Sequence, residues 1–350
     1  MPGKNWRARA AAGLVCAVGL ADPWRSAIGQ PAPSVSMPRL HHVGLNSVDP
    51  ERAIAWYLSV WPAAKRATFA GYPAVEADMM LLFSKVDRPP PGAWRNALHR
   101  SEAQSAFWHI GAFINTSDLA TTLRSVGVTH LPLFTSPTGT GTVWRSGLAP
   151  YTGTLSATQF PAPLSPPRPG GFSYVVAPDG VLFEFTGGPD TRASLSHVHF
   201  FHERPLCAAN WYVHHLGFEL PPARDTAGTE LRQQAFEPCE VPLGAAGWPS
   251  LEPVGTIRQP SGTVRHGNGS MGWYPRQCVG TRCGTDQPLV PSRGQALDHV
   301  AFSVADFDAL FARLERAGVT ILEAPHPFGA TRAFMIQDPD GLAIELVARP

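Results

Sequence analysis

The sequence predicts an α+β fold built from four similar modules, and three observations carry this prediction. An apolar stretch that opens on a histidine occurs four times, as HVGL at 42–45, HIGA at 109–112, HVHF at 197–200 and HVAF at 299–302. A segment with helix start or stop signals follows each of these stretches, and two modules end in nearly the same Pro-Asp-Gly hairpin. The 350 residues suit two domains of ~100–200 residues each, so we expect two modules per domain.

The four opening stretches have the character of β-strands in a duplicated unit. Their first histidines, His42, His109, His197 and His299, are separated by 67, 88 and 102 residues. Solenoid repeats keep a fixed period, and these separations are too variable for one. They are typical of one module copied several times, with loops of different length inserted into the copies.

Helix signals follow the opening strands. Asp49 is a favourable N-cap, and Pro50 suits the first helical position. Three further segments each end directly before a glycine, the residue preferred just beyond a helix C-terminus. They cover residues 119–126, 206–216 and 307–317.

The second and fourth modules close in matching hairpins. One turns at residues 178–180 and the other at 339–341, and both turns read Pro-Asp-Gly, a favourable turn sequence. In each hairpin a glutamate, Glu184 or Glu345, lies four residues after the glycine and has apolar neighbours on both sides. A carboxylate buried in such a strand is costly unless it is paired or bound to a metal, so these two glutamates are candidate ligands.

The N-terminus has the composition of an export signal. Basic residues among the first nine precede an apolar run at 10–21, which is shorter than the ~20 residues that span a bilayer. Residues 27–29 fit a small-x-small cleavage site. We therefore expect a signal peptide at 1–29, a Pro-rich linker at 30–38, and a periplasmic or secreted protein with no membrane contact after cleavage. A disordered cytoplasmic leader is the alternative.

Charge and cysteine content limit the partners and the redox compartment. The formal net charge is +1, which gives no electrostatic basis for binding nucleic acid. Four cysteines follow the expected signal peptide, and an even number in an exported chain permits two disulfides. A structural zinc site is the rival interpretation, and the sequence leaves the connectivity open. These cysteines are Cys207, Cys239, Cys278 and Cys283.

Strand-borne histidines with closing Pro-Asp-Gly-x-x-x-Glu hairpins resemble the glyoxalase/bleomycin-resistance/extradiol-dioxygenase group of the vicinal oxygen chelate superfamily. The resemblance covers about residues 39–348. It implies four βαβββ modules, paired into two domains with cupped mixed β-sheets. Modules one and two would form a first domain at 39–190. Modules three and four would form a second at 194–348, with a long insertion at 221–295 that holds further strands around 262–274.

The same resemblance implies two metal sites. Family members take ligands from the first strand of each module and from the last strand of the second module. Carried over, this gives His42, His109 and Glu184 in the first domain, and His197, His299 and Glu345 in the second. Two imidazoles and a carboxylate leave coordination positions open, as non-haem Fe(II) oxygenases require, so Fe(II) is the favoured cofactor. Mn, Zn, Ni and Co accept the same ligands.

Three further residues are candidates for a role in chemistry. Tyr174 corresponds to an active-site tyrosine of extradiol dioxygenases, whereas the matching residue of the fourth module is Met335. His199 shares a strand face with His197, because side chains alternate along a strand. Arg332 precedes the last hairpin and could contact an anionic substrate. Each of these residues is, taken singly, more often a packing or surface residue.

The functional expectation is therefore a metal-dependent enzyme that acts on a small substrate with two neighbouring oxygens. Extradiol ring cleavage is the favoured form, and a glyoxalase-like isomerase or lyase is the enzymatic alternative. A small-molecule binding protein without catalysis is the alternative of a different class. We expect the second domain to carry the chemistry, because its long insertion would help to exclude water from the site.

Overall fold

The computed structural model describes residues 36–61, 63–90, 105–115, 171–188, 192–224, 229–231, 235–237, 239, 261–274 and 289–349. The expected signal peptide and most of the linker lie outside these residues, as does the helix expected at 119–126. Among the described helices, none is long and apolar enough to cross a membrane.

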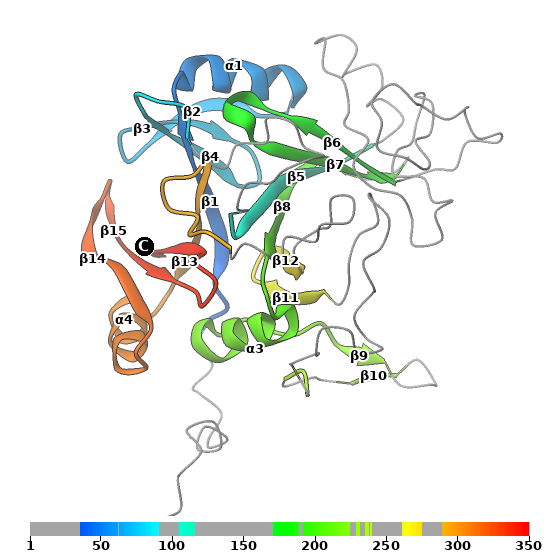
Figure 1. Ribbon diagram of the computed structural model, residues 1–350, viewed down its shortest axis with the longest axis vertical. Helices are drawn as coiled ribbons and strands as arrows, with labels where there is room; N and C mark the ends of the chain where they lie inside the picture. Colours follow the sequence, from blue (N-terminus) through cyan, green and yellow to red (C-terminus); the bar gives the residue numbers. More distant parts are fainter. Residues whose placement is uncertain are drawn as a thin grey trace, which may run out of the picture. The chain divides into compact units, whose positions relative to one another are not determined.

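One mixed sheet of eight strands combines the first and fourth modules (Figure 1). Its strand order is β14-β15-β16-β13-β1-β4-β3-β2. The first module supplies β1 (Arg39–Ser47), β2 (Lys65–Phe69), β3 (Tyr72–Glu76) and β4 (Met80–Lys85). The fourth module supplies β13 (Leu297–Val304), β14 (Thr320–Phe328), β15 (Thr331–Gln337) and β16 (Ala343–Ala348).

A second mixed sheet, of six described strands, combines the second and third modules in the order β11-β12-β8-β5-β7-β6. The second module supplies β5 (Phe107–Asn115), β6 (Gly171–Val176) and β7 (Leu182–Gly188). The third supplies β8 (Ser194–Phe201), β11 (Gly262–His266) and β12 (Gly269–Tyr274). The last two strands confirm the prediction of strands around 262–274. A short pair, β9 (Ala223–Arg224) and β10 (Glu230–Leu231), lies in the insertion.

Three described helices occur where the sequence predicts them: α1 (Pro50–Val60), α3 (Pro205–Leu216) and α4 (Phe307–Arg316). The Asp49 side chain accepts a hydrogen bond from the Arg52 amide at 3.1 Å, which confirms it as the N-cap of α1. Gly217 ends α3 with φ of 75°, a left-handed conformation that favours glycine. These helices bury one face each, with Tyr57, Tyr212 and Leu314 among the fully buried side chains.

The pairing of modules differs from the expected domain boundaries. β1 pairs antiparallel with β13, and β5 pairs antiparallel with β8. Modules one and four therefore share a sheet, as do modules two and three, so the division into 39–190 and 194–348 was wrong. The link from β7 to β8 spans only 189–193, whereas the links before β5 and before β13 are far longer. A short link favours the pairing of the modules that it joins.

The Pro-Asp-Gly turns connect consecutive modules, a role that the sequence did not indicate. Asp179 accepts hydrogen bonds from the Ser47 hydroxyl at 2.6 Å and from the Val48 amide at 3.1 Å. In the same way, the Asp340 carboxylate accepts from the Glu203 amide at 2.5 Å and lies 3.1 Å from Nδ1 of His202. Each turn thus holds the segment that follows the opening strand of the preceding module.

One disulfide, between Cys207 and Cys239, lies within the described residues. It joins the first turn of α3 to the part of the insertion that comes after β10. Cys278 and Cys283 lie outside the described residues, and so does any pairing between them.

Loss of this disulfide is expected to lower the free energy of unfolding by about 3–4 kcal/mol, because a cross-link restricts the unfolded chain. The sequence separation of 32 residues sets this magnitude. Denaturant unfolding of the oxidised protein and of Cys207→Ser/Cys239→Ser would measure it. Peptide mapping that recovers both cysteines as free thiols from the native protein would contradict the assignment.

Candidate metal centres

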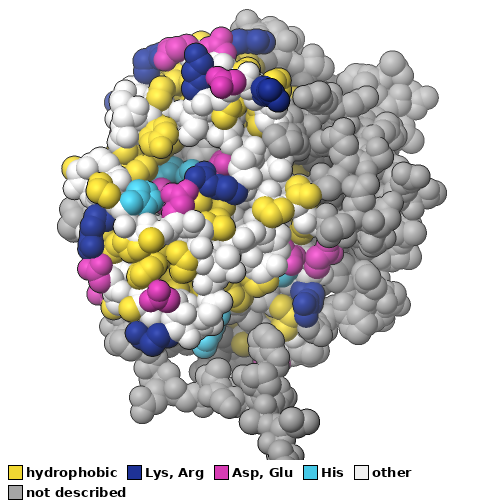
Figure 2. Space-filling view, turned by 60° about the vertical axis from the view of Figure 1, so that its left-hand side comes forward, with side chains coloured by type: hydrophobic (Ala, Val, Ile, Leu, Met, Phe, Trp, Pro, Cys, Tyr) yellow, Lys and Arg dark blue, Asp and Glu magenta, His cyan; other side chains and the backbone are white. Residues whose placement is uncertain are grey.

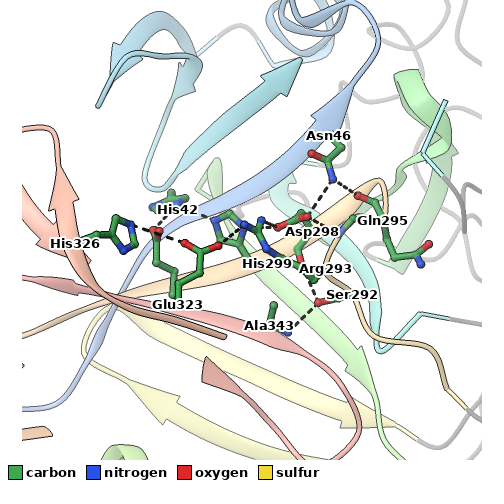
Figure 3. A network of polar contacts seen from close by, with 12 residues as sticks. His42, Asn46, Ser292, Arg293, Gln295, Asp298, His299, Glu323, His326 and Ala343 are labelled. Atoms are coloured by element: carbon green, nitrogen blue, oxygen red, sulfur yellow. Dashed lines mark hydrogen bonds and ion pairs between the residues drawn. The ribbon is translucent and has the colours of Figure 1, made fainter. Parts of the chain in front are cut away.

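The first candidate centre lies in the eight-stranded sheet and consists of His42 on β1, His299 on β13 and Glu345 on β16. Nε2 of His42 is 3.2 Å from Nε2 of His299 and 3.2 Å from Oε2 of Glu345. His42 and Glu345 are buried, and His299 is partly exposed. Figure 3 shows the His42 and His299 side chains next to each other, although they come from opposite ends of the chain.

Strand register explains how these three residues meet. Ala301 on β13 pairs with Glu345 on one side and with His42 on the other. His299 lies opposite Gly44, two residues further along β1. A Cβ atom on Gly44 would lie 2.0 Å from Cε1 of His299, so only glycine leaves room for this imidazole. The glycine in the opening His-Val-Gly is therefore part of the site.

The ligand spacing fits a divalent metal ion. Ligand atoms at about 2.1 Å from a metal are about 3.0 Å apart in octahedral geometry and about 3.4 Å apart in tetrahedral geometry. The two spacings of 3.2 Å at His42 fall between these values. Burial lowers the pKa of His42 to about 4, against the raising effect of Glu345, so this imidazole is neutral near pH 7. A neutral imidazole is the form that binds metals.

Asp298 orients one of these ligands. The Nδ1 proton of His299 points to Oδ1 of Asp298 at 2.7 Å, which leaves Nε2 free to bind a metal. Arg293 at 2.5 Å, the Gly294 amide at 2.6 Å and the Asn46 amide at 3.0 Å hold the carboxylate in place (Figure 3). Burial by itself raises the pKa of Asp298, but His299, Arg293 and Gly294 outweigh it and lower this pKa to about 2.

Replacement of Asp298 by Asn is expected to weaken metal binding at the first centre by about 10–100-fold, the usual effect of losing a partner of a metal-bound histidine. The fold should persist, because Asn keeps the size and one acceptor oxygen. Titration of the metal-free protein with Zn²⁺ or Co²⁺ would measure the change. An unaltered affinity would show that the contact between Asp298 and His299 does not serve a metal.

His41 also belongs to this centre, although it was not among the residues predicted from the sequence. A β-bulge between Leu40 and His42 brings His41 next to its neighbour, with 2.8 Å between the two Nδ1 atoms. One of these nitrogens carries a proton and donates a hydrogen bond to the other. The His41 ring also packs edge-on against Phe69, at 5.1 Å between centroids, and Phe328 stacks on His42 at 5.7 Å. The consecutive histidines were the available sequence signal.

Charged side chains from β14 border the first centre. Glu323 bonds to Arg293, and Oε2 of Glu323 is 3.9 Å from Nε2 of His326. Figure 2 shows histidines in a hollow of one face of the molecule, with acidic and basic side chains beside them. Polar groups are thus available at the entrance of the site.

The second candidate centre lies in the six-stranded sheet and consists of His109 on β5, Glu184 on β7 and His199 on β8. Nε2 of His109 is 2.9 Å from Oε2 of Glu184, and both residues are buried. Tyr274 on β12 packs against His199, with 5.0 Å between ring centroids. Burial and the charge of Glu184 raise the pKa of Tyr274 to about 12, so its hydroxyl keeps its proton near pH 7.

A cavity of about 720 Å³ adjoins the second centre. This volume is within the range of small-molecule sites, about 300–1,000 Å³. The cavity is lined by Phe113, His199, Pro221, Thr263 and residues 265–270. His199 therefore belongs both to the candidate metal cluster and to the wall of a cavity large enough for a substrate.

The structure keeps the predicted ligand types but changes their grouping. His299 and Glu345 lie together as predicted, and so do His109 and Glu184, but each pair takes its third ligand from a different module than expected. His42 completes the first centre, in place of His197. His197 pairs with Gly111 in the other sheet, and its side chain is outside the described residues.

The three predicted catalytic residues have different outcomes. His199 belongs to the second cluster itself, with His109 and Glu184, rather than standing beside His299. Tyr174 pairs with Glu184 across β6 and β7, so the two residues share a sheet face, but the Tyr174 side chain is outside the described residues.

Arg332 does not join either cluster, so its prediction was wrong. Its guanidinium bonds to Asp308 on α4 at 2.9 Å and lies 4.8 Å from the centre of the Phe307 ring. Met335, three residues later on β15, pairs with Glu345 on the face that carries the first centre. Because strand faces alternate every residue, Arg332 points to the helix-covered face instead.

Comparisons with known proteins agree with this architecture. Residues 194–346 match the model of the Glyoxalase/Bleomycin resistance protein/Dioxygenase superfamily. Glyoxalase I from Zea mays shares the fold at a TM-score of 0.52 and 14% identity, with 89% of this chain and 92% of that chain covered. A putative dioxygenase from Bacillus subtilis shares it at 0.51 and 9% identity, with 90% and 86% covered. No curated protein sequence matches. By sequence, residues 194–346 belong to the Glyoxalase/Bleomycin resistance protein/Dioxygenase superfamily, and the chain as a whole shares the fold of these two solved structures.

Proposed function

We propose that this protein is a metal-dependent enzyme that acts on a small substrate with two neighbouring oxygens, and that ring-opening dioxygenation of a catechol-like molecule is its reaction. The observation that carries the proposal is the arrangement of His42, His299 and Glu345. Two imidazoles and one carboxylate are the ligand set of non-haem Fe(II) oxygenases. Among the described residues, no fourth His, Cys, Asp or Glu joins this group.

The ligand set suits Fe(II), which when bound would act as a Lewis acid and a template for the two substrate oxygens. The surrounding residues have separate tasks. Asp298 keeps the proton of His299 on Nδ1. Phe69 and Phe328 cover the histidines with apolar surface and so limit the access of water. Burial lowers the pKa of His41, so His41 is neutral near pH 7 and able to accept a proton from a substrate hydroxyl.

An isomerase or lyase reaction is the second candidate, and the position of Glu323 favours it. This carboxylate is partly exposed at the entrance of the first centre, between Arg293 and His326. A carboxylate beside a metal-bound carbonyl compound would be able to move a proton between neighbouring carbons. Such a reaction consumes no oxygen, which separates it from ring cleavage.

Oxygen uptake tests the proposal most directly. The protein would be purified without oxygen, analysed for its elements, loaded with Fe(II) and mixed with catechols. We expect bound iron, and one O₂ consumed for each ring opened. If metal is bound and no catechol stimulates oxygen uptake, the dioxygenase proposal fails and the isomerase remains. If the protein binds no metal under any condition, both enzymatic candidates fail and a metal-free binding protein takes their place.

We also propose that the protein is exported. The basic and apolar start of the sequence supports this, as does the disulfide between Cys207 and Cys239, because disulfides persist mainly in oxidising compartments. Mature protein is expected to begin near residue 22 or 30. Recovery of Met1 or Pro2 by N-terminal sequencing of native protein would overturn the proposal.

A further inference from the structure

The two centres differ in the arginine that lies near each of them. At the first centre, Arg293 is neutralised by two carboxylates, those of Asp298 and Glu323. At the second, Arg265 lines the cavity next to His199 and is exposed. Glu219, which is also exposed, lies opposite Arg265 across an antiparallel bridge, but within the described part of the chain the Arg265 guanidinium forms no ion pair. Among the described residues, the second cavity therefore offers a guanidinium that is not held in an ion pair, whereas the arginine of the first centre is paired with two carboxylates.

Strand register places Arg265 on the same sheet face as the second centre. Thr263 on β11 pairs with Gly272 on β12, and Gly272 pairs with His199 on β8. Arg265 is two residues from Thr263 along β11, so its side chain points the same way. Two residues along a strand and two strands across a sheet separate the Cα atoms of Arg265 and His199 by about 12 Å.

That separation suits a substrate with two different ends. The Arg265 side chain lines the cavity, and a metal ion held by His109, Glu184 and His199 would lie at the His199 end of it. The space left between them is that of one ring or a short carbon chain. Phe113, an exposed apolar residue, lines the same cavity and offers contact to the carbon skeleton, while the hydroxyls of Thr263 and Ser270 offer hydrogen bonds.

We infer that the second cavity is a binding site for a carboxylated substrate, with Arg265 as the residue that selects the carboxylate. The neighbouring oxygens of that substrate would lie at the His109, Glu184 and His199 cluster, so the inference rests on the proposed function. The guanidinium fork matches a carboxylate through two parallel hydrogen bonds. The substrate class is thus a dihydroxybenzoate or a similar acid with vicinal oxygens. Tyr274 on β12 packs against His199 and so borders the oxygen-binding end of the cavity.

Binding of two matched probes tests this inference. Catechol and 3,4-dihydroxybenzoate would be titrated without oxygen into the metal-loaded protein, its Arg265→Gln variant and its Arg332→Gln variant. The last is the control, because Arg332 is an exposed arginine whose guanidinium pairs with Asp308. We expect wild type and control to bind 3,4-dihydroxybenzoate about tenfold or more tightly than catechol, a typical effect of a charged hydrogen bond. Arg265→Gln should lose this preference and keep its affinity for catechol.

Two further variants assign the effect to one centre. The preference for the carboxylated probe should survive Glu345→Gln, which alters the first centre, and should disappear in Glu184→Gln. An undiminished preference in Arg265→Gln would overturn the inference while leaving the proposed function intact. Failure of both probes to bind metal-loaded wild-type protein would overturn the inference and the catechol-directed function together.

Discussion

Glu345→Gln is expected to empty the first centre of metal without unfolding the protein. The substitution removes the only carboxylate of the cluster with His42 and His299 and keeps the shape of the side chain. Loss of a residue that only hydrogen-bonds to a metal ligand lowers metal affinity by about 10–100-fold. Loss of a residue that binds the metal directly should lower the affinity further. Metal titration of the variant would measure the loss, and circular dichroism would check the fold.

Glu323→Gln is the matched control for that experiment. Glu323 is also a glutamate beside the first centre, but its side chain is 36% exposed, against 6% for Glu345. Its carboxylate bonds to Arg293 rather than to a candidate ligand. We expect metal affinity near that of the wild type. If both variants bind metal as the unaltered protein does, Glu345 is not a ligand.

Gly44→Ala is expected to damage the same centre from the opposite strand. The added Cβ would lie 2.0 Å from Cε1 of His299, far inside van der Waals contact, so the imidazole must move away from His42. Overpacking of this kind costs about 1–3 kcal/mol of stability. We expect that loss in denaturant unfolding, together with loss of metal from the first centre.

Gly272→Ala provides the comparison for Gly44→Ala. A Cβ at Gly272 would meet Gly262 O at 3.4 Å and Cδ2 of His199 at 3.5 Å, which are ordinary contacts. This variant should keep nearly full stability and full occupancy of the first centre. Equal stability losses in the two variants would show that the loss in Gly44→Ala does not come from the close approach of His299 to Gly44.

Much of the fold was predictable because local signals and overall structure agree. The N-cap at Asp49 and the glycine at 217 mark helix ends that the structure reproduces. Apolar neighbours on both sides of Glu184 and Glu345 indicated buried carboxylates, and both side chains are buried beside a histidine. Helix ends and buried carboxylates of this kind depend on residues that are close in sequence, so they can be predicted from the sequence alone.

The pairing of modules was not predictable from the same signals. In each centre, two of the ligands belong to the same module: His299 and Glu345 to the fourth, and His109 and Glu184 to the second. These two ligands therefore lie together regardless of which other module pairs with theirs. Any module that opens on a strand-borne histidine is able to supply the third ligand. The sequence therefore specified the kinds of ligand but not the partner, which depends on the strand pairs β1 with β13 and β5 with β8.

Other residues of the site were missed because their positions depend on long-range geometry. His41 reaches the first centre through a β-bulge that alternation alone does not reveal. Tyr274 and Arg265 approach the second centre because β12 pairs with β8 and β11 with β12. Arg332, in contrast, was predictable from local alternation. It lies three residues before Met335 on β15, so its side chain points to the opposite face of the sheet, the one that the helix covers.

The metal content of two double variants tests the central claim that the chain forms two separate centres. We expect His42→Gln/Glu345→Gln to lose metal from one centre and keep it at the other, because both residues serve the same ion. His42→Gln/Glu184→Gln should lose both metals, because its residues belong to different centres. The reverse outcome, with one metal kept by the second variant and none by the first, would contradict this assignment and restore the pairing of consecutive modules.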